Sequence, residues 1–191
     1  MNNIDIQYKN ITSVLSKELA VYETIIDLFR QKQECILKGN IDNLKSIVEE
    51  IQSYDCDRVI FTGGEPAIQD LATIGGALKS LGMNLSIETN GTIPVDPIID
   101  WICVSPKDQL YPNLSIKQRT GDELKIVYCG QELSMYDDLR TGFSHSFLQP
   151  CYIESDSVEQ NGVSFQVVEK IVKKSPGWRL SLQTHKWMGV L

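Results

Sequence analysis

Residues that could bind a charged ligand follow several apolar runs in this sequence. Thr62-Gly63-Gly64-Glu65-Pro66 comes directly after the run RVIF. Two glycines allow a sharp turn that brings backbone N–H and C=O groups close to a ligand. The adjacent Glu65 carboxylate could pair with an ammonium group. Taken alone, the segment is better explained as a tight turn in which Pro66 starts a helix.

Three further segments place polar residues after an apolar run. Glu88-Thr89-Asn90-Gly91 offers a carboxylate and an amide, although Asn-Gly is also a common turn. Ser105-Pro106-Lys107 provides a hydroxyl, a rigid bend and a cation that could meet a carboxylate. Gln149-Pro150 adds another amide. Each segment alone is weak evidence for a site, but the ordered series is strong evidence.

The two histidines have different expected roles. His185 lies in the closing Gln183-Thr184-His185-Lys186, at the end of a predicted strand, and is a candidate for hydrogen bonding or proton transfer. A lone histidine is more often structural. His145 starts a predicted strand, which puts it at the opposite edge of the sheet, so we expect it to have a structural role.

The elements that must position these segments are strands separated by helices or loops. Apolar runs predict strands at 58–62, 85–88, 101–105, 124–128, 146–149 and 178–184. Helical patterns follow at 68–81, 131–140 and 162–174, the last with Asn161 as its expected cap. This alternation predicts a mostly parallel α/β sheet. Ligand sites in such sheets lie at the carboxyl ends of the strands, where the polar segments stand.

The first 50 residues have a different pattern. Residues 11–38 show an apolar four-three rhythm, and Gly39-Asn40 stops the helix. Asp42 or Asn43 could cap a second helix, whose apolar positions are Leu44, Ile47, Val48 and Ile51. The predicted helical hairpin either packs against the rest of the chain or binds a partner, and heptads this short favour packing. We therefore expect a helical segment at 1–42 and an α/β domain at 43–191.

Composition excludes several functional classes. A net charge of -7 argues against general binding of nucleic acids, which needs Lys and Arg to neutralise phosphates. No apolar run is long enough to span a membrane and no signal core is present, so we expect a cytoplasmic protein. Five scattered cysteines, with no CxxC spacing, indicate neither a disulfide framework nor a metal site.

The segments FTGGEP, ETNGT, SPK, LQP and RLSLQTHKW, in that order, resemble the 7-carboxy-7-deazaguanine synthase family. The resemblance covers roughly residues 45 to 191. It implies an incomplete radical S-adenosylmethionine partial barrel. It also implies a lyase of queuosine biosynthesis that converts 6-carboxy-tetrahydropterin to 7-carboxy-7-deazaguanine with release of ammonia. The family uses a [4Fe-4S] cluster, S-adenosylmethionine and Mg²⁺.

The resemblance also implies roles for individual residues. S-adenosylmethionine contacts are implied for Gly64, Glu65, Ser105, Pro106, Lys107, Gln149 and Pro150. Substrate contacts are implied for Thr62, Glu88, Asn90, His185 and the final carboxylate on Leu191. After Gln-Pro the family usually continues with a Met-Asp type of sequence, whereas this chain has Cys151-Tyr152, which weakens the adenosine contacts implied there.

One departure from the family is decisive. The family's cluster loop has a CxxxCxxC triad, a Thr that binds Mg²⁺ and an upstream Arg, and none of these precedes Arg58. Thiolates hold such clusters, so we expect no synthase activity from this chain alone. Three interpretations stay open: an enzyme completed by a cluster-bearing partner, a non-catalytic remnant that binds S-adenosylmethionine or a nucleoside, and a helical interaction protein. The absent first strand would leave RVIFT at the edge of the sheet.

Residues 5–50 resemble the helical flagellar chaperone of hook-associated proteins, on the segment ELAVYETIIDLFRQKQECILKGNIDNLKSIVEE. A natural fusion, a truncation with a replaced start and a mis-assembled reading frame would each explain the join. Two protein partners stay open: a second copy in a homodimer, and a helical partner bound through residues 11–38.

Overall fold

The computed structural model describes residues 41–54, 56–108, 114–153 and 158–187. The chain forms two compact units, Met1–Cys56 with His185–Leu191, and Asp57–Thr184, and each is considered by itself. The helix predicted at 11–38 and the carboxylate of Leu191 lie outside the described residues. The predicted boundary between residues 42 and 43 stays a prediction.

The first unit contains the second helix of the predicted hairpin. This helix, α2, spans Ile41–Gln52. Ile47 and Ile51 are buried and lie one helical turn apart, as the apolar pattern predicts. Asp42 and Asn43, which we expected as caps, lie inside the helix instead.

The second unit is built on a six-stranded parallel sheet. Its strands run in chain order: β1 Arg58–Phe61, β2 Asn84–Thr89, β3 Trp101–Val104, β4 Gly121–Tyr128, β5 Phe143–Pro150 and β6 Arg179–Leu180. All five ladders between neighbouring strands are parallel. The α/β fold class is therefore confirmed, and β1 is at the edge of the described sheet, as expected.

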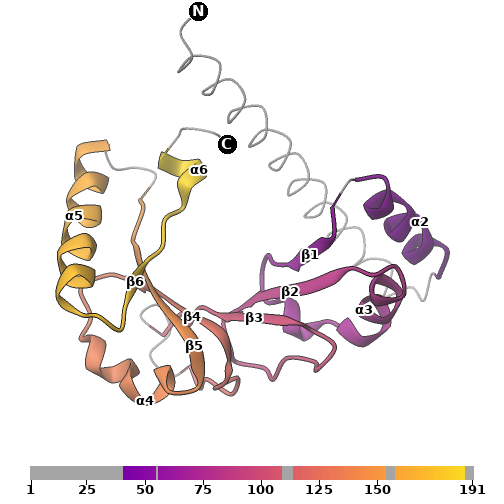
Figure 1. The fold of residues 1–191 in the computed structure, drawn as a ribbon, viewed down its shortest axis with the longest axis horizontal. Helices are drawn as coiled ribbons and strands as arrows, with labels where there is room; N and C mark the ends of the chain where they lie inside the picture. Colours follow the sequence, from indigo (N-terminus) through magenta and orange to yellow (C-terminus); the bar gives the residue numbers. More distant parts are fainter. Residues whose placement is uncertain (1–40, 55, 109–113, 154–157, 188–191) are drawn as a thin grey trace, which may run out of the picture. The chain divides into compact units, whose positions relative to one another are not determined.

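Helices cover one side of this sheet. They are α3 Leu71–Ser80, α4 Asp137–Arg140 after the 3₁₀ helix η2 Leu133–Tyr136, and α5 Val158–Lys174. Figure 1 shows the strands side by side in chain order, with these helices along the outer side of the sheet. A parallel strand order without reversal produces this arrangement, because right-handed crossovers all pass over the same face.

The two faces of the sheet have different chemistry. The helix-covered face holds a fully buried core of Val104, Leu124, Ile126 and Leu148, packed against α4, α5 and Trp178. Side chains alternate along a strand, so the residues between these positions lie on the opposite face. There the register places four residues in one row across β2 to β5: Glu88, Cys103, Glu123 and His145. We call this opposite side the inner face.

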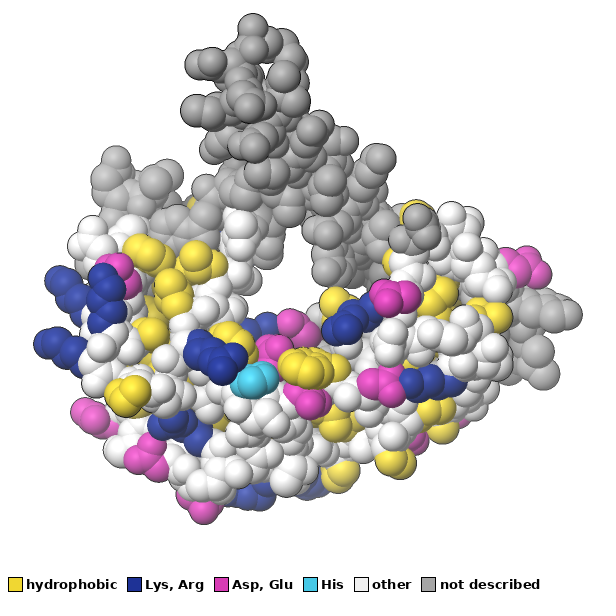
Figure 2. Space-filling model, viewed as in Figure 1, with side chains coloured by type: hydrophobic (Ala, Val, Ile, Leu, Met, Phe, Trp, Pro, Cys, Tyr) yellow, Lys and Arg dark blue, Asp and Glu magenta, His cyan; other side chains and the backbone are white. Residues whose placement is uncertain are grey.

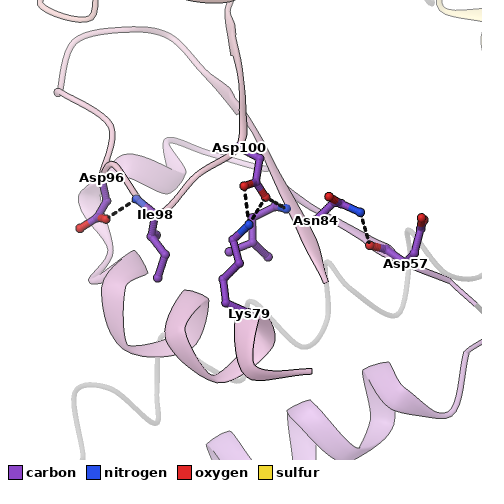
Figure 3. A network of polar contacts seen from close by, with 7 residues as sticks. Asp57, Lys79, Asn84, Asp96, Ile98 and Asp100 are labelled. Atoms are coloured by element: carbon purple, nitrogen blue, oxygen red, sulfur yellow. Dashed lines mark hydrogen bonds and ion pairs between the residues drawn. The ribbon is translucent and has the colours of Figure 1, made fainter. Parts of the chain in front are cut away.

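A polar network holds the amino ends of β2 and β3 together (Figure 3). The Asp100 carboxylate accepts a hydrogen bond of 2.6 Å from Leu85 N and forms an ion pair with Lys79 of α3. These two contacts, the Leu85 amide first, lower the pKa of Asp100. Asn84 donates from its backbone and its side chain to the carbonyl of Asp57, which joins the start of β2 to β1. The network fixes the strand starts, so the opposite ends are aligned as well.

Two further sequence-based predictions about elements are wrong. The strand expected at 178–184 contains only Arg179 and Leu180, because the chain leaves the ladder after Ser181 N donates to Leu148 O. Asn161 does not cap α5 but lies inside it. Its buried side chain donates to the carbonyl and accepts from the amide of Ile153, each at 2.9 Å. This pairing gives both backbone groups of Ile153 a hydrogen-bond partner.

Candidate functional site

The polar segments found in the sequence gather at the carboxyl edge of the sheet. The segment 62–66 follows β1, Glu88 and Thr89 end β2 with Asn90 directly after them, Ser105 to Lys107 follow β3, and Gln149-Pro150 end β5. Because the strands are parallel and consecutive, all these segments lie at one edge. The expected placement is therefore observed. The ligand contacts of the individual residues stay predictions.

Glu65 ties the turn after β1 to the end of β2. Its Oε1 accepts hydrogen bonds from Ala67 N at 3.0 Å and Thr89 Oγ1 at 2.5 Å, and its Oε2 accepts one from Asn90 N at 2.7 Å. The preceding glycines, Gly63 and Gly64, have φ values of 82° and 57°, which other residues rarely adopt. A carboxylate has about four acceptor positions, so Glu65 is held firmly and can still accept hydrogen bonds from a ligand.

The turn after β2 is built around Gly91. Its φ is 80°, and its carbonyl accepts hydrogen bonds from Lys117 N and Gln118 N at 2.8 and 2.9 Å. A Cβ atom on Gly91 would lie 2.7 Å from Val104 Cγ1. The side-chain oxygen of Asn90 accepts a hydrogen bond from Thr92 N, so this oxygen serves the turn. The side-chain oxygen of Asn90 therefore stabilises a turn, as the common Asn-Gly pattern predicts.

Lys107 is a partly buried cation. Its Nζ donates to Ser105 Oγ at 3.0 Å, and Ser105 and Pro106 are buried. Burial lowers the pKa of Lys107, and the charge of Lys125 lowers it further, against the opposing effect of Glu88. An anionic ligand would compensate this buried positive charge, which supports the predicted pairing of Lys107 with a carboxylate.

Lys125, on the inner face, is a candidate site residue that the sequence reasoning missed. Its Nζ lies 2.6 Å from Glu88 Oε1, across strand β3, where Cys103 stands between them. Burial alone would lower the pKa of Lys125, but the charges of Cys103 and Glu88 raise it above its ordinary value. The alternation of β4 contains the missing signal, since Leu124 and Ile126 face the core and Lys125 between them must face inward.

An aromatic group lies on the inner face toward the amino edge. Trp101 Nε1 donates to Glu123 Oε1 at 3.1 Å, and its ring stacks on His145 at 6.2 Å between centroids. Phe147 meets His145 edge-on at 6.5 Å. This packing agrees with the structural role expected for His145. Among the described residues, His145 Nδ1 is the buried side-chain atom that lacks a hydrogen-bond partner.

Comparison with known proteins identifies the family. The 7-carboxy-7-deazaguanine synthase of Bacteroides thetaiotaomicron is 38% identical over 152 residues, which are 80% of this chain and 75% of that protein. The chain belongs to the 7-carboxy-7-deazaguanine synthase family. The synthase of Neisseria meningitidis is 34% identical over 77% of this chain and 72% of its own length. No protein-family model matches the chain.

Other members of the 7-carboxy-7-deazaguanine synthase family extend beyond the matched part. The Bordetella pertussis synthase is 39% identical, and the match covers 72% of this chain but 61% of that protein. The crystal structure of QueE from Escherichia coli matches with a TM-score of 0.57 and 25% identity, over 74% of this chain and 63% of that one. This match confirms the fold expected from the sequence, a radical S-adenosylmethionine partial barrel of which part is present.

The described residues of this family member form no ligand set for an iron–sulfur cluster. Within the described part of the chain, no three His, Cys, Asp or Glu side chains gather as metal ligands. The sequence itself contains no CxxxCxxC spacing. Thiolates are the ligands that hold such clusters in proteins.

The structure does not place two predicted site residues relative to the edge of the sheet. His185 was expected at the end of a strand, but it lies in the short helix α6 Thr184–Trp187, within the other compact unit. Leu191 lies outside the described residues. Substrate contacts of both residues in this family member stay predictions.

None of the described helices is long and apolar enough to cross a membrane. In the view of Figure 2, acidic and basic side chains are interspersed, and neither sign covers the whole face.

Proposed function

We propose that this chain supplies the S-adenosylmethionine site and part of the substrate site of a 7-carboxy-7-deazaguanine synthase in queuosine biosynthesis. The substrate would be 6-carboxy-tetrahydropterin and the product 7-carboxy-7-deazaguanine, in the cytoplasm. The main support is the Glu65 carboxylate, which three donors of its own chain hold at the sheet edge where ligands bind.

The methionyl part of S-adenosylmethionine has one ammonium and one carboxylate group, which suit two residues of the edge. Glu65 would accept hydrogen bonds from the ammonium, beside the open backbone of Gly64. Lys107, whose positive charge is partly buried, would bind the carboxylate with Ser105 as its neighbour. Gln149 and Pro150 would contact the nucleoside at the end of β5. These roles agree with the charges and positions of the residues.

The pterin would lie over the inner face and the adjacent turns. Glu88 and Asn90 stand at the end of β2, Thr62 follows β1, and His185 and the carboxylate of Leu191 would complete the set. Lys125 holds the Glu88 side chain through their ion pair, so we add Lys125 as a positioning residue. The ordering of Glu88 before the substrate arrives lowers the entropic cost of binding.

The chain alone would not carry out the synthase reaction. Its residues offer no thiolate triad for a [4Fe-4S] cluster, and the ligands for the cluster and for Mg²⁺ would have to come from a partner that supplies the missing segment. The alternative is a protein that binds S-adenosylmethionine or a related nucleoside without catalysis. This alternative is favoured by the combination of an ordered carboxyl edge with the lack of the cysteine triad.

Calorimetric titration with S-adenosylmethionine tests the proposed site. We expect binding by the wild-type chain and at least tenfold weaker binding by Glu65→Gln and by Lys107→Met. Lys173→Met removes an exposed lysine of α5 and is the matched control, with unchanged affinity expected. Equal affinity of all four proteins, or no binding by the wild type, would refute the site.

Anaerobic iron–sulfur reconstitution separates the two functions. The non-catalytic binding protein would bind S-adenosylmethionine with no stoichiometric iron and no product formation, even with an added cluster-bearing fragment of a relative. The completed enzyme would form 7-carboxy-7-deazaguanine only when that fragment is present. Product formation by the isolated chain would refute the expected lack of activity.

A further inference from the structure

Two cysteines stand side by side at the carboxyl edge of the sheet. Cys129 directly follows β4 and Cys151 directly follows β5. The last register pair of the two strands is Tyr128 with Pro150, so the next residue of each strand is a cysteine. Neighbouring strands are about 4.8 Å apart. This spacing is within the Cα separation of roughly 4.4–6.8 Å that disulfides require.

Both thiols belong to the same face of the sheet. Leu148 of β5 faces the core, and Tyr128 of β4 packs against that core. Side chains alternate along a strand, so Val127 and Gln149 face the other side of the sheet. Cys129 and Cys151 each come two residues later and therefore share that side. The two thiols interact with each other. Burial raises the pKa of Cys129, and the charge and hydrogen bonding of Cys151 raise it further.

The backbone on either side of the pair is fixed. Gln131 accepts a hydrogen bond from Cys129 N at 2.7 Å and donates to Val127 O at 2.9 Å. After Cys151, the buried Asn161 side chain holds both backbone groups of Ile153. These contacts order each segment beyond its strand, and the β4–β5 ladder keeps the two strand ends adjacent. This arrangement favours a bond between the thiols over reactions with other molecules.

The other described cysteines differ from this pair. Cys103 is buried, and burial raises its pKa to about 12, so it reacts slowly near neutral pH. Cys56 is exposed and belongs to the other compact unit. The pair also departs from the family resemblance, in which Gln-Pro is followed by a different sequence.

We propose that Cys129 and Cys151 are a redox-active dithiol that closes to an intramolecular disulfide on reaction with a small-molecule disulfide such as oxidised glutathione. The thiolate of the exposed Cys129 attacks one sulfur of the oxidant, and a mixed disulfide forms as one thiolate of the oxidant leaves. The Cys151 thiolate then attacks Cys129 Sγ and releases the second thiolate. Two protein thiols are oxidised, two small thiols are formed, and the two protons go to solvent or to these products.

The oxidised pair would link the ends of β4 and β5 next to Gln149 and Pro150. The proposal is independent of the proposed function, because it depends only on the two thiols and their strands. Excess reduced glutathione would reverse a disulfide formed between these adjacent residues. The state of the site would therefore depend on the ratio of reduced to oxidised glutathione around the protein.

The test uses the full chain and three variants. Reduced protein is incubated anaerobically with oxidised glutathione, remaining thiols are alkylated, and the peptides are mapped by mass spectrometry. The wild type and Cys56→Ser should each lose two thiols and yield one linked peptide pair containing residues 129 and 151. Cys129→Ser and Cys151→Ser should yield no such pair. The remaining cysteine of each should carry a glutathione adduct. Oxidation should accelerate as the pH rises from neutral, because the Cys129 thiol, whose pKa is raised, is mostly protonated there.

Phenylarsine oxide gives a second readout, because it bridges two neighbouring thiols. It should protect two thiols of the wild type and of Cys56→Ser from alkylation, and none in either single variant of the pair. The proposal is overturned if the wild type retains all its thiols with both reagents. It is also overturned if the disulfide joins other cysteines or two chains.

Discussion

The Lys125 ammonium group lies 2.6 Å from a carboxylate oxygen of Glu88, although the two residues belong to strands separated by β3. The pair spans the inner face of the sheet above Cys103. Its two members are unequally buried, with side-chain exposure of 16% for Lys125 and 46% for Glu88. Removal of the Glu88 carboxylate and removal of the Lys125 ammonium should therefore change the stability of the protein by different amounts.

Glu88→Gln should destabilise the protein more than Lys125→Met. Removal of the carboxylate leaves a mostly buried ammonium without its ion-pair partner, at a cost of roughly 1–3 kcal/mol. Removal of the ammonium leaves a carboxylate that water can reach. The double variant should recover part of the stability lost by Glu88→Gln. Urea denaturation of the four proteins measures these differences, and equal effects of the two single substitutions would contradict the argument.

Glu65→Gln should lower both the stability and the affinity for S-adenosylmethionine. The amide of glutamine would place a donor opposite one of the N–H or O–H groups that Glu65 now accepts from, which costs about 1–3 kcal/mol. Glu132→Gln is the control, because Glu132 is exposed and makes no side-chain capping bond at η2. A Glu65→Gln protein as stable as the control would show that the three hydrogen bonds contribute little.

Gly91→Ala and Gly76→Ala should change stability in opposite directions. At Gly91 a methyl group meets Val104 and the backbone has φ of 80°, so a loss of at least about 1–2 kcal/mol is expected. Gly76 lies within α3 with open space around its Cβ position, so alanine should stabilise the helix by up to about 1 kcal/mol. Thermal unfolding of both variants provides the measurement, and a tolerated alanine at residue 91 would show that the turn is less crowded than described.

Stability should fall as the pH rises above 9 because of Cys103. Burial raises the pKa of this thiol from 9.0 to about 12 in the folded protein. Between these values the unfolded chain releases a proton that the folded chain retains, so unfolding becomes easier by on the order of 1 kcal/mol per pH unit. Denaturant titrations at pH 8, 9 and 10 should show this slope. It should become shallower in Cys103→Ala, and an unchanged slope would assign the effect to other groups.

The sequence was informative where local patterns alone determine structure. The apolar runs located β1 to β5, and the polar residues after them marked the carboxyl edge. The inner face was harder to predict, because the direction of Lys125 or Trp101 depends on the register of neighbouring strands, which no single run contains. Asn161 was misassigned because the sequence does not distinguish an asparagine that caps a helix from one whose side chain bonds to the backbone of Ile153. His185 was misplaced because the last apolar run leaves the sheet after two residues.

The order of the strands has an evolutionary consequence. Within the described sheet each strand bonds only to its neighbours in the chain, and β1 has β2 as its one partner. Replacement of the segment before Asp57 would therefore break no hydrogen bond among the described strands. Such an architecture can exchange its beginning through recombination and keep its later registers, so folding and catalytic competence can be lost separately during descent.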